Sequence, residues 1–175
     1  QLRVSTNIGF HSNTVANDFG LQSLQIFYPE MDATKNRFLK SFSGNYTKNI
    51  QNFELGFGLA YAERAPSVSE GYGFYLYNSS DFYDYIGNPN LKNEKAIEGN
   101  FSAAYKTNLF TTKITGSYFY FSDYIIGKID PKINPMTIGA ARVKIYEAID
   151  NAVIFNTDLN MEYAFLENWK LKSEL

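Results

Sequence analysis

The stretch that decides the fold reads Phe53-Glu54-Leu55-Gly56-Phe57-Gly58-Leu59-Ala60-Tyr61. Large apolar side chains occupy every second position of this stretch, and small or charged ones occupy the positions between them. Successive side chains of a β-strand point to opposite faces. The stretch therefore predicts a strand with one large apolar face and one small or polar face.

The same alternation returns along the chain. It is clear over residues 2–10, 97–105 and 153–163, and weaker over residues 37–46 and 110–120. No helix period or helix cap is recognisable between these segments. Segments of about 9 to 11 alternating residues are typical of membrane β-barrels, but the strands of a soluble β-sandwich also alternate. Alternation alone therefore leaves both folds open.

The lengths of the connections favour the barrel. Three connections are short (residues 47–52, 106–109 and 166–168), and three are long (residues 11–36, 64–93 and about 124–142). Short and long connections alternate strictly, which places all short turns at one end of an up-and-down sheet, as in outer-membrane barrels. We therefore predict an all-β fold, an antiparallel up-and-down transmembrane β-barrel segment of about seven strands, with a possible extra rim strand over residues 21–28.

Seven strands cannot close a bacterial barrel, which has an even number of strands. We expect residues 1–175 to be a partial β-barrel domain whose remaining strands lie elsewhere in a longer protein. Aromatic residues flank every short turn, as a girdle at the periplasmic membrane boundary would require; ordinary cross-strand aromatic pairing would explain them as well. These residues are Tyr46, Phe53, Tyr105, Phe110, Phe165 and Trp169.

Composition argues against several functions. The net charge of −2 provides no basic face for nucleic acid. The absence of cysteine excludes disulfides and thiolate metal sites. His11 is the only histidine, and no serine lies in a nucleophile-elbow motif. We therefore expect no enzyme activity, no catalytic residue, no metal site and no cofactor.

Two motifs lie at the feet of the second long connection. The first reads Arg64-Ala65-Pro66-Ser67-Val68-Ser69-Glu70, and the second reads Gly87-Asn88-Pro89-Asn90-Leu91-Lys92-Asn93-Glu94. Together they resemble the Arg-Ala-Pro-Ser and Gly-Asn-Pro-x-Leu-x-x-Glu motifs of TonB-dependent receptor barrels. A third segment, residues 151–159, departs from the family pattern, with Asn156 in place of Gly and Asp158 in place of Glu.

We expect the motif residues to form scaffolding at the barrel rim, with Arg64 and Glu94 paired across neighbouring strands. Proline ends ladder pairing because it lacks an N–H, and Gly and Asn are natural turn formers. The residues assigned to this rim motif are Arg64, Ala65, Pro66, Ser67, Glu70, Gly87, Asn88, Pro89, Leu91 and Glu94.

The resemblance implies a receptor in the outer membrane of a Gram-negative bacterium, in contact with outer-membrane lipid. It implies active uptake of a scarce nutrient chelate, such as a siderophore-iron complex, another metal complex or cobalamin. A TonB-type energy-coupling protein would act through a plug domain, which residues 1–175 do not contain. The alternatives are a passive outer-membrane porin or adhesin, and a secreted carbohydrate-binding β-sandwich.

The second long connection is also rich in aromatic residues. Loops on a rigid scaffold commonly carry binding sites, and tyrosine offers an apolar ring with a polar tip. We expect this loop to contact the chelate, although the rings would also be explained by packing within the loop or by an outer aromatic belt. The candidate ligand-binding residues are Tyr72, Tyr75, Tyr77, Asp81, Tyr83, Asp84 and Tyr85.

Overall fold

The computed structural model describes residues 1–166 and 169–175. All of the described strands belong to one sheet, in the order β1-β2-β3-β6-β7-β8-β5-β4, with β9 also paired to β8. Two short helices, α1 (Asp18–Gln25) and α2 (Val68–Tyr72), accompany the sheet. The strands are β1 (Leu2–Thr14), β2 (Thr34–Ile50), β3 (Phe53–Arg64), β4 (Leu76–Asn78), β5 (Tyr83–Ile86), β6 (Glu94–Lys106), β7 (Phe110–Asp130), β8 (Arg142–Leu166) and β9 (Trp169–Glu174).

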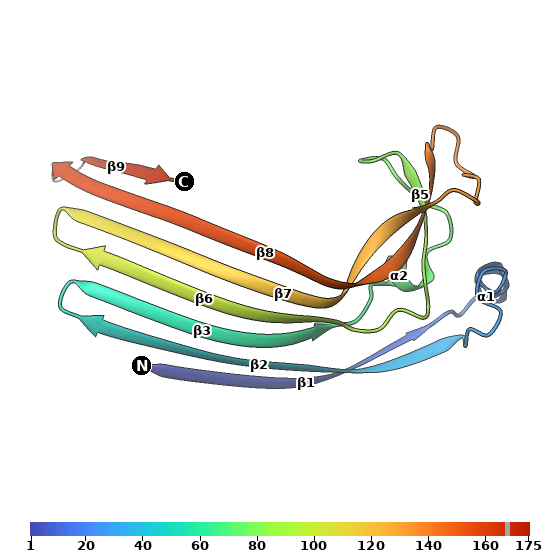
Figure 1. The fold of residues 1–175 in the computed structure, drawn as a ribbon, viewed down its shortest axis with the longest axis horizontal. Helices are drawn as coiled ribbons and strands as arrows, with labels where there is room; N and C mark the ends of the chain where they lie inside the picture. Colours follow the sequence, from blue (N-terminus) through green and yellow to red (C-terminus); the bar gives the residue numbers. More distant parts are fainter. Residues whose placement is uncertain (167–168) are drawn as a thin grey trace.

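The predicted up-and-down segment is confirmed. Seven strands follow one another as antiparallel neighbours, namely β1, β2, β3, β6, β7, β8 and β9. The short turns lie at one end of the sheet, and the helices and long connections gather at the other end (Figure 1). Because the described strands form a single sheet with no second sheet packed against it, the β-sandwich alternative is wrong.

The short turns are tighter than the sequence suggested. β2 and β3 are joined by Gln51 and Asn52 alone, and β6 and β7 are joined by residues 107–109. Gln51 has φ 52°, a left-handed conformation that suits a two-residue hairpin. The third predicted short turn includes Glu167 and Asn168, which lie outside the described residues.

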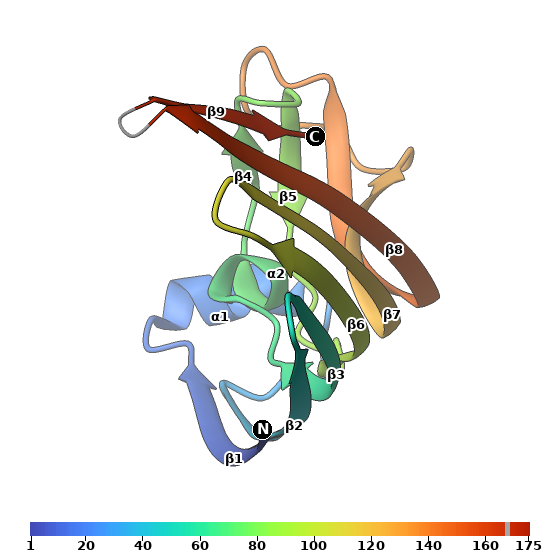
Figure 2. The same cartoon turned by 90° about the vertical axis from the view of Figure 1, so that its left-hand side faces the viewer.

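The sheet is bent into an arc, and α1 and α2 lie on its concave side (Figure 2). Alternate residues of each strand face the two sides. On the convex side, Phe57 and Leu59 of β3 are 55% and 68% exposed, and Phe57 packs on Phe101 of β6 with ring centroids 5.3 Å apart. On the concave side, one row crosses six strands and is made of polar residues and one glycine: Arg3, Asn45, Gly58, Asn100, Ser117 and Asn156.

Two rows bound the apolar band on the convex side. Toward the short turns, the ring of Phe53 packs against that of Tyr105 with centroids 4.8 Å apart, and the ring centroids of Phe165 and Trp169 are 6.5 Å apart. Tyr46 departs from the predicted girdle, because it pairs with Phe57, higher on the wall. At the other boundary Glu63 is paired with Lys95. The ten steps from Phe53 to Glu63 climb about 33 Å along β3, or about 25 Å at a tilt of about 40°, which matches the apolar band of membrane barrels.

The rim is the part of the molecule beyond this charged boundary: α1, α2, β4, β5, residues 124–130 of β7, residues 142–149 of β8 and their connections. Among the residues whose burial the structure describes, all of the buried large apolar side chains lie there: Leu24, Met31, Ile86, Leu91, Ile125 and Val143. No helix among the described residues is long and apolar enough to cross a membrane.

Three predictions about the rim are wrong. The expected strand over residues 21–28 is instead largely α1, whose first turn is capped by Asn17; its side chain accepts hydrogen bonds from the N–H groups of Phe19 and Gly20 at 2.8 and 3.2 Å. The expectation that no helix cap interrupts the strands is also wrong, because Ser67 and Glu70 form a complete capping box on α2. The third long connection is shorter than expected, because β7 continues to Asp130.

Candidate functional site

The two rim motifs meet in a charged cluster. Arg64 donates to both oxygens of Glu94, from Nε to Oε1 at 3.2 Å and from Nη2 to Oε2 at 3.1 Å. The same guanidinium donates to Glu70 at 2.7 and 3.2 Å. Glu94 is only 7% exposed and also accepts the N–H of Ile125 at 3.1 Å. The predicted Arg64–Glu94 pair is therefore confirmed, and Glu70 extends it to α2.

Protonation in this cluster is fixed by these contacts. Burial alone would raise the pKa of Glu70, but hydrogen bonds from Arg64 and Ser67 outweigh it and lower the pKa below its usual range. The pKa of Arg64 rises because its guanidinium donates to Glu94 and Glu70. One arginine thus bridges two carboxylates, one on the barrel wall and one on the helix.

The second motif packs directly on α2. Gly87 donates its N–H to the carbonyl of Gly73 at 2.7 Å, and Asn88 donates to the carbonyl of Glu70 at 2.8 Å. A Cβ at Gly87 would lie 2.5 Å from the nitrogen of Gly73 and 2.6 Å from that of Tyr72. No side chain fits there, so this motif position requires glycine.

The loop is also fastened to β2. Lys35 Nζ donates to the carbonyl of Pro89 at 2.7 Å, and Arg37 Nη2 donates to that of Leu91 at 2.7 Å. Pro66, Pro89 and Leu91 are buried, and Ala65 is half-buried. The motif residues are thus held by backbone contacts and by ion pairs within the protein, so the geometry supports a scaffolding role for the motif.

Beyond the motif, the loop reaches across the barrel wall. β5 pairs in parallel with residues 142–145 of β8, although β6 and β7 lie between β3 and β8 (Figure 1). Asp84 of β5 is completely buried, and its Oδ2 accepts the N–H groups of Met136 and Thr137 at 2.8 and 2.9 Å. Burial opposes ionisation of Asp84, but these hydrogen bonds prevail and lower its pKa. We therefore assign Asp84 to loop structure and remove it from the candidate ligand contacts.

A polar-aromatic cluster forms where β5 meets β8, which we call the Lys144 cluster: Asp81, Tyr83, Tyr85, Lys144 and Tyr146. Lys144 Nζ donates to Asp81 Oδ2 at 2.7 Å and to the Tyr85 hydroxyl at 3.2 Å, and lies 4.1 Å from the centre of the Tyr83 ring. The Tyr85 hydroxyl donates to Asp81 Oδ2 at 2.5 Å. The rings of Tyr85 and Tyr146 are 5.1 Å apart. The cluster presents aromatic faces and polar tips side by side, half exposed to solvent.

The charges of this cluster balance. The hydrogen bond from Lys144 lowers the pKa of Asp81, and the same bond raises the pKa of Lys144. Burial, helped by the hydrogen bond to Asp81, raises the pKa of Tyr85. At neutral pH Asp81 and Lys144 therefore form an ion pair, and the phenols of Tyr85 and Tyr146 are neutral. The cluster can offer aromatic faces for stacking and polar groups for hydrogen bonds to a ligand.

The other candidate residues lie elsewhere. Tyr72 ends α2, and burial raises its pKa. Tyr75 packs against Phe74 and Phe27, with centroids 5.0 and 6.4 Å apart, which joins the first long connection to the second. Tyr77 is exposed in β4. The structure thus brings together three of the seven candidates, Asp81, Tyr83 and Tyr85.

Sequence analysis missed Lys144 and Tyr146. Both lie where a loop was expected to end, and only the parallel pairing of β5 with β8 places them beside Tyr83 and Tyr85. The one available signal was the alternation of Arg142, Lys144 and Tyr146 on one parity. Among the described residues, no group of His, Asp or Glu side chains could hold a metal ion.

Comparison with known proteins extends this picture. No protein-family model matches the chain, and no curated protein sequence does. Solved structures do match: the copper transporter OprC superposes with a TM-score of 0.71 over 99% of this chain and 25% of that one, at 18% identity. This is the fold of a TonB-dependent receptor barrel.

Two other receptors with this fold match a smaller part of the chain. The siderophore receptor PirA from Pseudomonas aeruginosa has a TM-score of 0.58 at 17% identity, covering 79% of this chain and 27% of that one. A mutant ferric enterobactin receptor PfeA from Pseudomonas aeruginosa, in complex with enterobactin, has a TM-score of 0.57 at 16% identity, covering 79% and 22%. The chain spans about a quarter of the length of the TonB-dependent receptor structures it matches.

Proposed function

We propose that this chain is part of the barrel of an outer-membrane receptor for active, TonB-energised uptake of a scarce nutrient chelate. The observation that carries the proposal is the likeness to a receptor barrel along 99% of the chain. The rim motifs support the proposal independently. Their residues, which match the family pattern, form one connected cluster that joins the barrel wall to the loop. In this proposal, the complete receptor also contains the remaining strands and a plug domain, and a TonB-type partner supplies energy.

The Lys144 cluster is the proposed ligand contact. Its aromatic faces suit stacking on a planar chelate, and the phenol and ammonium groups suit hydrogen bonds to chelate oxygens. The cluster is held by strand pairing on β8 and by the Asp84 contacts beneath it, so its side chains are positioned before any ligand arrives.

The test of transport uses the full-length receptor in its own bacterium. Deletion of the gene is expected to reduce uptake of one radiolabelled chelate from a panel of ferric siderophores, copper complexes and cobalamin. In the parent strain, a protonophore is expected to abolish the uptake that depends on the gene. Uptake that survives the protonophore would favour a passive porin and contradict active transport.

The test of the site compares three tyrosines of the same loop. Tyr83→Ala and Tyr85→Ala are expected to weaken chelate binding about tenfold, the usual scale for an aromatic side chain at a binding hot spot. Tyr77→Ala is the matched control, because Tyr77 is exposed and lies outside the cluster. Equal binding by all three variants, with normal barrel assembly, would limit the cluster to loop packing.

A further inference from the structure

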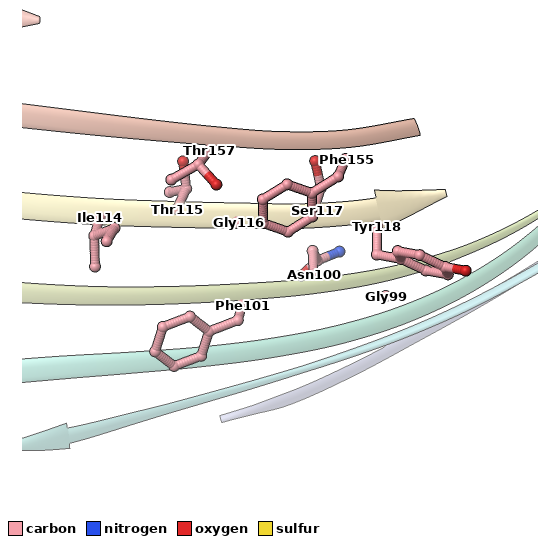
Figure 3. A pocket seen from close by; sticks show the side chains of 10 residues that line it. All are labelled: Gly99, Asn100, Phe101, Ile114, Thr115, Gly116, Ser117, Tyr118, Phe155 and Thr157. Atoms are coloured by element: carbon pink, nitrogen blue, oxygen red, sulfur yellow. The ribbon is translucent and has the colours of Figure 1, made fainter. Parts of the chain in front are cut away.

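A hollow of about 400 Å³ opens on the convex side of the wall, over β6, β7 and β8 (Figure 3). Its floor is formed by Gly99 and Gly116, and large side chains surround them: Phe101, Ile114, Tyr118 and Phe155. These residues share the parity that faces away from α1 and α2. The lining is overwhelmingly apolar, so the hollow suits a hydrocarbon group.

The two floor glycines are not required by the backbone. A Cβ at Gly116 would approach no atom closer than the carbonyl oxygen of Asn156 at 4.0 Å, and a Cβ at Gly99 would meet only Leu59 Cδ2 at 3.8 Å. Gly87, by contrast, has three backbone atoms within 2.8 Å of that point. Larger side chains would fit at both floor positions, and their absence is what makes the hollow.

The position of the hollow indicates what fills it. On β6, Gly99 lies four residues from Lys95 in the charged boundary, and Phe101 lies four residues from Tyr105 in the aromatic boundary. β6 and β7, which carry the two floor glycines, have paired neighbours on both sides, so the floor of the hollow faces outward from the wall. At this depth the surrounding solvent is lipid tails.

We propose that the hollow binds one acyl chain of a membrane lipid. This inference rests on the proposed function for the membrane placement of the chain. Between surfaces immersed in lipid, association depends on van der Waals packing and not on expulsion of water. An acyl chain in the hollow contacts the backbone of Gly99 and Gly116 and also the aromatic side chains around them. An acyl chain on a smooth wall contacts the protein on one side only.

The test fills the hollow in the full-length receptor. Gly116→Leu replaces the proposed lipid with a protein side chain, and Gly99→Leu does the same from the neighbouring strand. Gly44→Leu is the matched control, since Gly44 faces the convex side, lies in the same row as Leu59 and Gly99, and has no atom within 4 Å of its Cβ position. It adds the same apolar side chain at the same depth without filling the hollow.

The readout is native mass spectrometry of the purified receptor titrated with dipalmitoylphosphatidylglycerol. The wild type and Gly44→Leu are expected to hold one more lipid than either floor variant at equal concentration, with about tenfold weaker retention in the variants. Equal retention in all four proteins would overturn the acyl-chain site while leaving the receptor function intact. A wild-type protein that does not fractionate with the outer membrane would instead overturn the proposed function.

Discussion

The wall and the rim of this molecule follow opposite rules. On the wall, Leu59 and Phe155 are 68% and 69% exposed and the inward row is polar. In the rim, Leu24 and Val143 are buried and charged groups such as Lys128 and Glu147 lie outside. One chain thus folds for two solvents, apolar side outward where lipid is expected and apolar side inward where water is expected.

The two regions also differ in what holds them together. The wall relies on regular antiparallel ladders and cross-strand pairs such as Phe57 with Phe101. The rim relies on specific contacts made by single residues, such as the ion pairs of Arg64 and the close approach of Gly87 to the backbone of α2. In the wall, the effect of a substitution on stability should therefore depend on the face of the sheet on which the residue lies. In the rim, the effect should depend on the individual residue.

The largest expected effect concerns orientation, that is, whether the rim or the short turns lie outside the cell. In a full-length receptor otherwise free of cysteine, Ser79→Cys in the rim is expected to react with a membrane-impermeant maleimide on intact cells. Asn52→Cys, in the turn between β2 and β3, is expected to react only after the outer membrane is opened. Both residues are exposed, so the reverse labelling pattern would invert the proposed orientation.

The next largest effect concerns the two sides of the wall. Leu159 faces the convex side beside Ile114, and Asn160 faces the concave side beside Lys113. Leu159→Arg is expected to destabilise the full-length barrel by about 2 to 4 kcal/mol, because it places a charge among lipid tails, and Asn160→Arg by about 0 to 1 kcal/mol. Unfolding in guanidinium from lipid vesicles measures both losses. Equal losses would contradict the assignment of the two faces, and a larger loss for Asn160→Arg would reverse it.

Two glycines of the rim, Gly87 and Gly71, test whether the effect of a substitution there depends on the individual position. Gly87→Ala forces a methyl group against the backbone of Tyr72 and Gly73, and is expected to cost about 1 to 3 kcal/mol locally. Gly71→Ala is the control, because nothing lies within 4 Å of its Cβ position and alanine favours the helix. Hydrogen exchange of the β5 amides is expected to accelerate only in Gly87→Ala, with the wall unchanged; similar protection in both variants would contradict the contact.

The smallest effect is an expected absence of pH response in the Lys144 cluster. The stabilisation from Asp81, whose pKa is lowered, is present above its ordinary value of 3.8 and lost only as pH falls through the lower folded value. That from Lys144, whose pKa is raised, is present below 10.5 and lost only as pH rises through the higher folded value. The mobility of a nitroxide at Ser79→Cys should therefore be constant from about pH 5 to about pH 9; a step within that range would mean that the pair does not form.

The contrast between wall and rim also explains what the sequence could predict. Period-two alternation predicted the seven wall strands, because the polarity of each wall residue depends only on the face of the sheet on which it lies. The same logic failed in the rim. Residues 21–28 contain apolar residues at spacings that suit a strand or a helix, and Asn17 decides between them by capping α1. The capping box of Ser67 and Glu70 was present in the sequence and was overlooked inside a family motif.

The candidate site was predictable only in part, for a related reason. Asp81, Tyr83 and Tyr85 are close in sequence, so composition alone singled them out. Lys144 joins them from 59 residues beyond Tyr85, through a parallel pairing that no local pattern signals. Asp84 has the same residue type as Asp81 three positions away, and only burial separates a structural carboxylate from a candidate ligand contact.

The parallel pairing of β5 with β8 has a consequence for the order of folding. Residues paired near the turn of a wall hairpin such as β2–β3 are close in sequence, whereas β6, β7 and the start of β8 separate Ile86 from its partner Ile145 along the chain. Long-range pairings of this kind form late, since the entropy of closing the chain precedes the gain from contact. We therefore expect docking of β4 and β5 on β8 to be a late step of folding, and its reversal to be an early opening step that exposes the Lys144 cluster while the wall stays intact.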